Sequence, residues 1–499
     1  MITYSLRPRP VSYFGDTRLF RRFTLILGAL RQDIGHSVAS CLVKCSQIKA
    51  TYRFWANKKV SHHTIMAIEQ DKLISHLIEK DTAAYIAATC RVVLHIQDTT
   101  TVNLSHQKSA HQVPCLNYAY HRGYFVHSSL VTDSEGCIEG HLDQMVWGRS
   151  EADLGTSKVL QSAQKSLPIA CKESNRWVDH FESFQSIIGE LAHTHGISIS
   201  DSESDIYELF TAKNRDNVDL IVRSHHNRQL VMPDGKALTL YNYLSDLPIQ
   251  GQYWLEVLND DKHTHRMANL AIRFSEVSIK LPENLQWSSS IPRAARRLAQ
   301  KMTAKKGLTL RAIEVTEINP LPDMKPIHWT LLTTLPVNDF WDAMQVIEYY
   351  VIRWRIEIFH LVLKEGCAIE KLQLEKPQRI QNAIAMYSIV AAEVTTLRYV
   401  AETKGQKPMT LTGFTHKQYE YLNQYLITNY NIVLPRPQTK IEIPTVQQFM
   451  QVINCLAGGH KGNKNTIVGI RQLWKGLSVA KIILKAFDAF DAYNADNST

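Results

Sequence analysis

Apolar residues along this chain follow two different periods. Near the N-terminus they recur at roughly helical spacing, which predicts a helical region over about 15–75. From residue 91 the pattern changes, because the run Arg-Val-Val-Leu-His-Ile-Gln is apolar and rich in β-branched residues. This run predicts a strand over 91–97 that stops at Asp98. The helical spacing is carried by Leu25, Leu27, Leu30, Ile34 and Val38.

Short strands then alternate with helices. The stretches 126–131 and 138–146 flank Thr-Asp-Ser-Glu-Gly at 132–136, which predicts a β-hairpin. The other elements predicted before residue 229 are a helix near 184–191, a strand at 196–200 that ends on Asp201, a helix at 206–212 and a strand at 220–224.

Strand-like segments dominate the next hundred residues, and helices follow them. A long amphipathic helix is predicted over about 339–364, with Gly366 as its stop signal. The whole pattern predicts an α/β core that carries a β-strand insertion, with helical domains at both ends of the chain. The predicted domain limits are 1–75, 76–375 with the insertion at about 229–335, and 376–499.

The composition is typical of a globular protein, but it does not identify a binding partner. Hydrophobic residues make up 44% and charged residues 21%, which is typical of a globular chain. The formal charge of +9 admits a polyanionic partner but does not prove one. Eight scattered cysteines argue against a zinc ribbon and a disulfide framework. The longest apolar stretch, near 383–392, is shorter than the ~20 residues that span a bilayer, so we expect no membrane span. Charges and prolines interrupt the first ten residues, which does not fit a secretory signal. With the scattered cysteines, this predicts a reduced, cytoplasmic protein.

The predicted long helix carries the clearest chemical signal. Tyr350, Arg353, Glu357 and Lys364 lie at i, i+3, i+7 and i+14, which at ~100° per residue places them within an arc of about 60°. A carboxylate there can bind a divalent ion, and an arginine can bind a phosphate through two hydrogen bonds. The simpler interpretation is an exposed helix face with an Arg353–Glu357 ion pair.

Two acidic strand ends favour the chemical interpretation. An aspartate at the C-terminal end of a strand faces the crevice where α/β folds place their sites. Asp98 and Asp201 occupy such ends, and together with Glu357 they form a carboxylate trio that can hold two metal ions. Each aspartate also has a structural alternative, since Asp98 can be a turn residue and Asp201 can cap the helix that follows. Asp205 is the fallback if Asp201 has no catalytic role.

The spacing Tyr350-x2-Arg353-x3-Glu357-x6-Lys364 resembles the signature of the DDE transposases of bacterial insertion sequences. Further motifs follow in that family's order over nearly the whole chain. They include Gly15-Asp16-x-Arg18 with Arg22, Gln97-Asp98-Thr99-Thr100, Asp201-x-Glu203-x-Asp205, Val222-Arg223-Ser224, Trp329-x-Leu-Leu-Thr333 and Leu456-Ala-Gly-Gly459.

This resemblance implies a ribonuclease-H-like core in which Asp98, Asp201 and Glu357 hold two Mg²⁺ ions, with Mn²⁺ as a substitute. It implies a cut-and-paste DNA transposase that cleaves transposon ends, forms hairpins and joins the 3′ ends to target DNA. It also implies a homodimer in which each subunit cuts the end that its partner holds. The implied DNA contacts are Tyr350, Arg353, Lys364, Arg223, Arg18 and Arg22, with Trp329 receiving a flipped base.

Two departures and two alternatives stay open. Ser202 follows the second aspartate where relatives commonly carry Arg, which puts one phosphate contact in doubt. The basic segment 293–306 looks longer than in relatives and is either a solvated surface or a DNA site. One alternative function is a domesticated or inactive transposase that binds DNA ends without cutting. The other is a stand-alone nuclease, although such an enzyme needs neither terminal helical domain.

The remaining features have structural explanations. The pairs His62-His63 and His225-His226 lack neighbouring ligands at metal-binding spacing. A C-terminal stripe at intervals of four and three residues is usually ordinary core, but the resemblance makes a dimer contact a second possibility. The stripe comprises Leu473, Leu477, Ala480, Leu484 and Phe487.

Overall fold

The chain forms two compact units in a computed structural model. Unit 1 comprises Met1–His76, Thr99–Leu154 and Trp354–Thr499, and unit 2 comprises Leu77–Asp98 and Gly155–Arg353. Each unit therefore combines segments distant in sequence, and the three consecutive domains stay a prediction. The structure describes residues 13–32, 34, 41–42, 45–107, 110–151, 154, 169–259, 264–282, 307–320, 326–434, 443–459 and 468–496.

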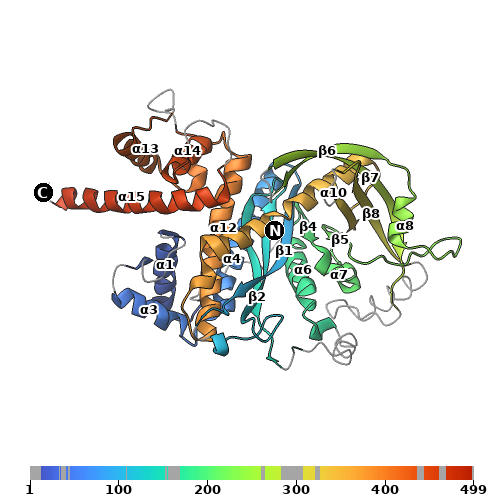
Figure 1. Cartoon of the computed structure of the whole chain (residues 1–499), viewed down its shortest axis with the longest axis horizontal. Helices are drawn as coiled ribbons and strands as arrows, with labels where there is room; N and C mark the ends of the chain where they lie inside the picture. The colour runs from blue at the N-terminus through green and yellow to red at the C-terminus, as the bar shows by residue number, and fades with distance from the viewer. Residues whose placement is uncertain are drawn as a thin grey trace. The chain divides into compact units, whose positions relative to one another are not determined.

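Unit 1 is built around one long apolar helix, α12 (Pro377–Thr403), which begins with a proline at a position that suits it. The N-terminal helices α1 (Thr17–Gln32) and α3 (Cys45–Trp55) pack against α12, as does strand β3, and Figure 1 shows α12 running between them. The helical N-terminal region is thus confirmed. The other helices of this unit are α4 (His62–Ile86, whose last residues belong to unit 2), α11 (Arg355–Leu361), α13 (His416–Tyr430), α14 (Val446–Leu456) and α15 (Ile470–Asp496).

Among the described residues, α12 alone is long and apolar enough to cross a membrane. The core helix of a folded domain can have the same length and apolar composition, and 83% of the most apolar stretch of α12 is buried inside the protein. Its buried side chains include Asn382, whose amide donates to the carbonyls of Trp55 and Val60 at 2.9 and 3.1 Å. The helix thus serves as the core of unit 1, which needs apolar side chains around its whole circumference.

The predicted hairpin is confirmed in unit 1. Strands β2 (Gly123–Asp133) and β3 (Ile138–Trp147) pair antiparallel. Gly136 adopts a φ of +82° in the connecting turn, where a glycine avoids the strain that a side chain would bring. The hairpin joins the second half of strand β1 (Arg91–Asn103), so the strand order in this unit is β3-β2-β1.

Unit 2 contains a mixed sheet of order β1-β4-β5-β9-β8-β7-β6. Its first three strands are parallel, and every later neighbour pairs antiparallel. The strands after residue 229 thus continue the same sheet through the β5–β9 pairing. The bounds are β4 (Thr194–Ser200), β5 (Val218–Arg223), β6 (Gly251–Asn259), β7 (Thr264–Ile279), β8 (Leu308–Glu317) and β9 (His328–Thr333).

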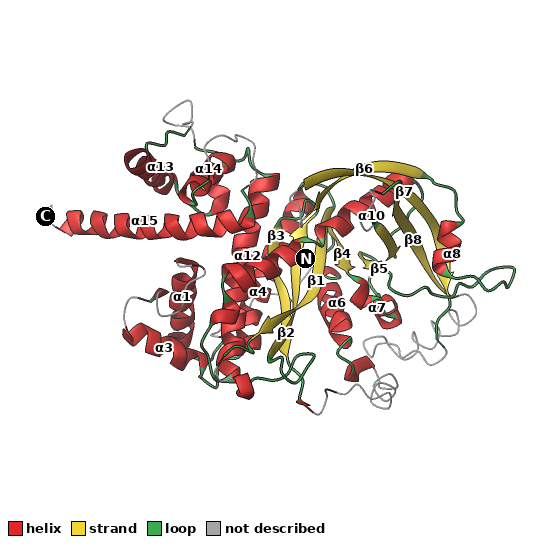
Figure 2. Cartoon of the chain, viewed as in Figure 1, coloured by secondary structure: helices red, strands yellow, loops and turns green. Residues whose placement is uncertain are grey.

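Helices pack on the parallel part of this sheet. Figure 2 shows α6 (Asn175–Ile188) and α7 (Tyr207–Ala212) beside β4 and β5, and α6 contacts both β4 and α7. A side chain at Gly196 of β4 would meet the Phe184 ring of α6 at 2.7 Å, so the glycine permits this close approach. The other helices of this unit are α8 (Leu240–Ser245) and α10 (Phe340–Ile352), the second of which contacts β4.

Candidate active site

Asp98 and Asp201 leave neighbouring parallel strands of unit 2 at equivalent positions. In the β1–β4 pairing Ile96 lies opposite Ile199, and each aspartate comes two residues later. Asp201 keeps an extended backbone, with φ −84° and ψ −170°. Because side chains alternate along an extended chain, both carboxylates start from the same face of the sheet. The pairing therefore brings the two predicted aspartates to one edge.

The prediction that the first strand stops at Asp98 was wrong. Strand β1 continues to Asn103, because the three threonines after Asp98 are β-branched and suit an extended backbone. Only the pairing with β4 ends, at Ile96. Asp98 is thus a strand residue just past the last β1–β4 pair, and it is not the turn residue of the structural alternative.

Two buried arginines of unit 2 lie near these carboxylates. Arg353 Nη1 is 3.6 Å from Asp98 Oδ2, and both side chains are about nine-tenths buried. Arg176, in the first turn of α6, contacts Glu203 with 2.8 Å between Nη2 and Oε2. Burial lowers the pKa of Arg176, while the carboxylates of Glu203, Glu173, Asp201 and Asp98 act in the opposite direction. The site thus combines two largely buried guanidinium groups with the buried Asp98 and the more exposed Asp201 and Glu203.

Asp201 also has the capping role of its structural alternative. Its Oδ1 accepts the backbone N–H of Glu203 at 2.9 Å, and it caps the short 3₁₀ turn Ser202–Ser204. A carboxylate has two oxygens and several lone pairs, so one capping bond does not prevent it from binding a cation. The capping and chemical interpretations are therefore compatible.

Asp205 has a structural position. Its carboxylate is fully buried and forms an ion pair with the equally buried Arg228. Its Oδ2 accepts the backbone N–H groups of His225 and His226 at 2.7 and 2.9 Å. This carboxylate therefore holds the loop after β5, and the fallback role for Asp205 loses its support.

Three predicted DNA-binding residues of unit 2 form a row of neighbouring side chains that begins at Asp98. They are Arg353, Tyr350 and Trp329. The Arg353 guanidinium lies 5.9 Å from the centre of the Tyr350 ring, and the Tyr350 ring lies 5.8 Å from the Trp329 ring. Tyr350 and Arg353 are buried, whereas Trp329 is half-buried. Arg223 contacts the neighbouring backbone, with 3.4 Å between its Nη2 and the carbonyl oxygen of His328. The fold therefore links Trp329 and Tyr350 through Arg353 to Asp98, and Arg223 lies beside the residue before Trp329.

The single long helix predicted over 339–364 is wrong. Helix α10 ends at Ile352, α11 spans Arg355–Leu361, and a π turn follows over Val362–Gly366. Backbone N–H groups of Arg353 and Glu357 donate three residues back, which overwinds the chain, whereas the π turn underwinds it. Equal steps of ~100° therefore do not apply, so the helical-wheel argument no longer supports a common face for the four signature residues, and that face stays a prediction.

The rest of the signature belongs to unit 1. Glu357 is half-buried in α11, and Lys364 is half-buried in the π turn. His360, one turn after Glu357, is buried, and a ring nitrogen lies within 4.8 Å of a Glu357 carboxylate oxygen. A glutamate and a histidine at i and i+3 on one helix are a pattern that binds divalent metals.

Sequence reasoning missed two of these side chains as site residues. His360 lies between Glu357 and Lys364 of the signature, and its Glu-x-x-His spacing from Glu357 is a metal-binding signal present in the sequence. Arg176 had no local signal, because a single arginine in a polar stretch gives no hint of its tertiary partners.

The predicted N-terminal DNA contacts lie on α1 of unit 1. Arg18 is 87% exposed at the side chain and pairs with Asp16 at 3.0 Å. Arg22 borders a hollow of about 370 Å³ that also receives Lys485 of α15. The exposed guanidinium of Arg18 is thus available to a phosphate, at little cost for breaking a surface ion pair.

The C-terminal stripe is core within the chain. Leu473, Leu477, Ala480 and Leu484 are buried, and α15 packs against α12, α13 and α14. Phe487 stacks on Tyr421 of α13, with ring centres 4.6 Å apart. Four of the five stripe residues are therefore core, and a dimer contact through this helix stays a prediction. Among the α15 side chains that the structure describes, Val479 and Ile482 are large, apolar and exposed.

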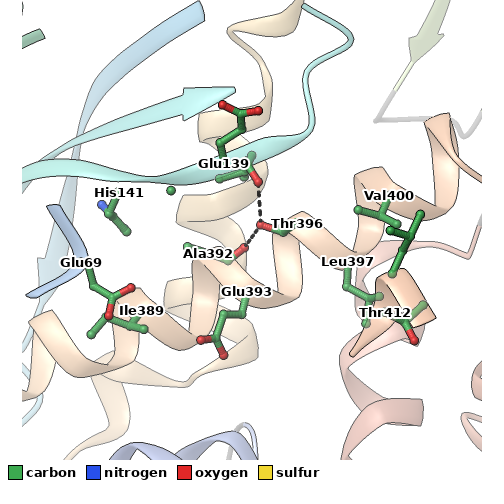
Figure 3. A pocket seen from close by; sticks show the side chains of 13 residues that line it. Glu69, Glu139, His141, Ile389, Ala392, Glu393, Thr396, Leu397, Val400 and Thr412 are labelled. Carbon is green, nitrogen blue, oxygen red and sulfur yellow. Dashed lines mark hydrogen bonds between the residues drawn. The ribbon is translucent and has the colours of Figure 1, made fainter. Parts of the chain in front are cut away.

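A second hollow in unit 1, of about 260 Å³, is rich in carboxylates. Figure 3 shows Glu139 at one end and Glu69 and Glu393 at the other, with Thr396 between them bonded to the carbonyl of Ala392. Lys72 pairs with Glu69 and Arg31 with Glu393, and His76 Nε2 lies 3.7 Å from Glu139 Oε1. Because each carboxylate has a neighbour from the chain itself, we assign no ligand to this hollow.

The histidine pairs follow their structural explanation. His62 Nε2 lies 3.0 Å from Gln144 Oε1, and the backbone of His225-His226 binds Asp205. The basic segment 293–306 lies outside the described residues.

Comparison with known families agrees with this geometry. Residues 12–60 match the family model for transposase DNA-binding, and residues 224–392 match that for the transposase DDE domain. The first range contains Arg18 and Arg22, and the second contains Trp329 and the whole Tyr-Arg-Glu-Lys signature. The matches support a DDE transposase that acts on DNA, with a ribonuclease-H-like core and divalent metal ions. The oxygen-rich donor set of Asp98 and Asp201 fits such ions.

Proposed function

We propose that this protein is a cut-and-paste DNA transposase with Asp98, Asp201 and Glu357 as its catalytic carboxylates. The observation that carries the proposal is the register of β1 and β4, which brings Asp98 and Asp201 to one sheet edge of unit 2. The match of residues 224–392 to a transposase DDE domain contains Glu357 and supports an enzyme of this kind, whereas Asp98 and Asp201 lie before the matched range and rest on the strand register. The strand orders β3-β2-β1 and β1-β4-β5, read through the shared strand β1, are those of a ribonuclease-H-like core.

Chain connectivity supports Glu357 as the third carboxylate. Arg353 is paired with Asp98, and Glu357 follows four residues later. Four residues reach at most ~14 Å even when fully extended, and less in a helix. Connectivity therefore limits how far Glu357 can lie from Arg353, and His360 offers a nitrogen ligand one turn further along α11.

The proposed chemistry follows from charge. A phosphodiester repels an anionic nucleophile. Bound divalent ions lower the pKa of the attacking water or 3′-hydroxyl and stabilise the leaving oxygen. The carboxylates of Asp98, Asp201 and Glu357 hold such ions, and Mg²⁺ suits their hard oxygen donors, with Mn²⁺ as a substitute. Arg353 and Lys364 place positive charge for the DNA backbone, and Trp329 offers a ring for an extruded base.

Paired cutting of two ends requires more than one active site, so we propose a homodimer with cleavage in trans. Most of the α15 stripe is buried within one chain, so we place the subunit contact at the exposed Val479 and Ile482 of the same helix. Sedimentation of the protein bound to two DNA ends tests this assembly. A mass of one subunit for each pair of ends would contradict it.

The test of the main proposal uses DNA that carries both flanks of the gene. Asp98→Asn, Asp201→Asn and Glu357→Gln should each reduce Mg²⁺-dependent cleavage at least tenfold while binding to the ends persists. Asp234→Asn is the matched control, because Asp234 is an exposed carboxylate of unit 2. A wild-type protein that binds the ends but never cuts them would instead favour the inactive, DNA-binding alternative.

A further inference from the structure

Arg176 is an unusual residue to find beside a metal-binding edge. Its side chain is only 10% exposed, yet it carries a permanent charge. The guanidinium is held on three sides: Nη2 by Glu203 at 2.8 Å, Nη1 by the carbonyl of Glu173 at 2.9 Å, and one face by the Trp177 ring at 5.2 Å. Burying a charged group costs free energy unless it is paired. The contact with Glu203 therefore explains why a buried guanidinium is tolerated here, but it does not explain the function of Arg176.

The surroundings of Arg176 point to the active site. Its partner Glu203 belongs to the turn that Asp201 caps, because the Glu203 backbone N–H donates to Asp201 Oδ1 at 2.9 Å, and the charges of Asp201 and Asp98 also act on the guanidinium. Arg353 is the second guanidinium in this region and pairs with Asp98. The two arginines thus balance part of the negative charge that the aspartates concentrate at the sheet edge.

We propose that Arg176 is a positioning residue that stands in for cations at Asp98 and Asp201 in the metal-free protein and binds a DNA phosphate oxygen once metal is bound. This inference rests on the proposed function. Cations held by the two aspartates would repel the guanidinium, and a DNA phosphate would then be its nearest strong anion. At present Nη2 donates to Glu203 and Nη1 to the Glu173 carbonyl, and the planar fork can direct two N–H groups to one phosphate.

The residue after the second aspartate strengthens this assignment. Ser202 carries no charge, so the turn that follows Asp201 offers no cation of its own. Glu203, the next residue in that turn, instead binds the guanidinium of Arg176. Helix α6 thereby delivers to Asp201 the positive charge that the turn lacks.

The test separates charge from shape with two variants. Arg176→Gln removes the charge, and Arg176→Lys keeps the charge but loses the fork. Arg215→Gln is the control, because Arg215 is a half-exposed arginine of unit 2 that pairs only loosely with Glu190, at 3.9 Å. Mn²⁺ binding to DNA-free protein is measured by electron paramagnetic resonance, and cleavage is measured at saturating Mg²⁺.

Arg176→Gln should bind Mn²⁺ on the order of tenfold more tightly than wild type, because a competing cation is gone, as expected for about 1.4 kcal/mol. Its cleavage at saturating Mg²⁺ should fall by roughly 10²-fold, the usual loss for one transition-state donor. Arg176→Lys should bind Mn²⁺ like wild type and still cleave slowly. Unchanged Mn²⁺ affinity and cleavage in Arg176→Gln, or a lowered melting temperature with unchanged Mn²⁺ affinity, would overturn the inference. A wild-type protein that neither binds Mn²⁺ nor cleaves would instead refute the proposed function.

Discussion

Replacing Asp205 tests directly which acidic residue after β4 is structural. Asp205→Ala removes a carboxylate that is 0% exposed and leaves Arg228, 2% exposed, as a buried charge without its partner. Losing one member of a buried pair typically costs about 3–5 kcal/mol. Two backbone N–H groups, those of His225 and His226, lose their acceptor in the same step, so we expect the upper part of that range.

This loss should be visible as a melting temperature lowered by roughly 10 °C, since 1 kcal/mol shifts the melting of a unit of ~200 residues by about 2–4 °C. Asp201→Ala is the matched comparison. It removes one capping bond at an exposed turn, worth ~1 kcal/mol, and should melt within a few degrees of wild type while losing cleavage. The assay is thermal unfolding by circular dichroism, with cleavage measured on the same samples.

A double-substitution cycle strengthens this test. Arg228→Met alone leaves the Asp205 carboxylate buried and unpaired, whereas the double variant removes both charges and should recover much of the lost stability. If Asp205→Ala instead melts like wild type and loses cleavage, Asp205 is a catalytic carboxylate and the structural assignment is refuted.

Two further predictions concern other parts of the chain. Burial lowers the pKa of His141 from 6.5 to about 4, so the folded protein binds its proton less readily than the unfolded chain. The free energy of unfolding is therefore unaffected by protonation of His141 above pH 6.5 and falls as the pH drops toward 4. Between pH 7.5 and 5, the free energy of unfolding measured in urea should fall by roughly 2 kcal/mol less in His141→Gln than in wild type. An equal fall in both proteins would contradict this. Trp329→Ala should slow hairpin formation about tenfold or more and leave first-strand nicking nearly unchanged, as expected for a ring that stacks on a base at ~1–3 kcal/mol. Equal loss of both steps with a lower melting temperature would make Trp329 a core residue, and Trp329→Phe is the control that keeps a stacking surface.

The sequence predicted that the two strands at the site exist, but it predicted their lengths less well. The β-branched run before Asp98 and the apolar run before Asp201 identify the two strands. Their pairing to each other, with Ile96 opposite Ile199, depends on contacts between residues a hundred positions apart. Local pattern also placed the end of β1 too early, because polar threonines look like a loop while their backbone bonds continue the sheet.

The interrupted helix shows a different limit. Apolar periodicity over residues 339–364 reports that one side is buried, and it is insensitive to a single overwound turn. The turn falls between two arginines with different anchors. Arg353 pairs with Asp98 in unit 2, whereas Arg355, in unit 1, lies on the Tyr399 ring at 3.6 Å and donates to the Glu135 carbonyl at 3.0 Å. These anchors are tertiary, so no helical-wheel argument can include them.

The charges at the site show why the limits of sequence prediction matter for function. A sequence motif identifies the carboxylates, because acidic residues at strand ends and on one helix are spaced regularly. It does not identify the cations that make such a cluster tolerable before metal binds, because Arg176 comes from a helix far from either aspartate in sequence. In unit 2 both cations are buried guanidinium groups and not flexible lysines, and a guanidinium stays charged at any physiological pH. These two groups offset part of the carboxylate charge and cannot release a proton, so metal ions bound at the aspartates would have to move them. This is why we place the test of Arg176 on metal affinity in addition to cleavage.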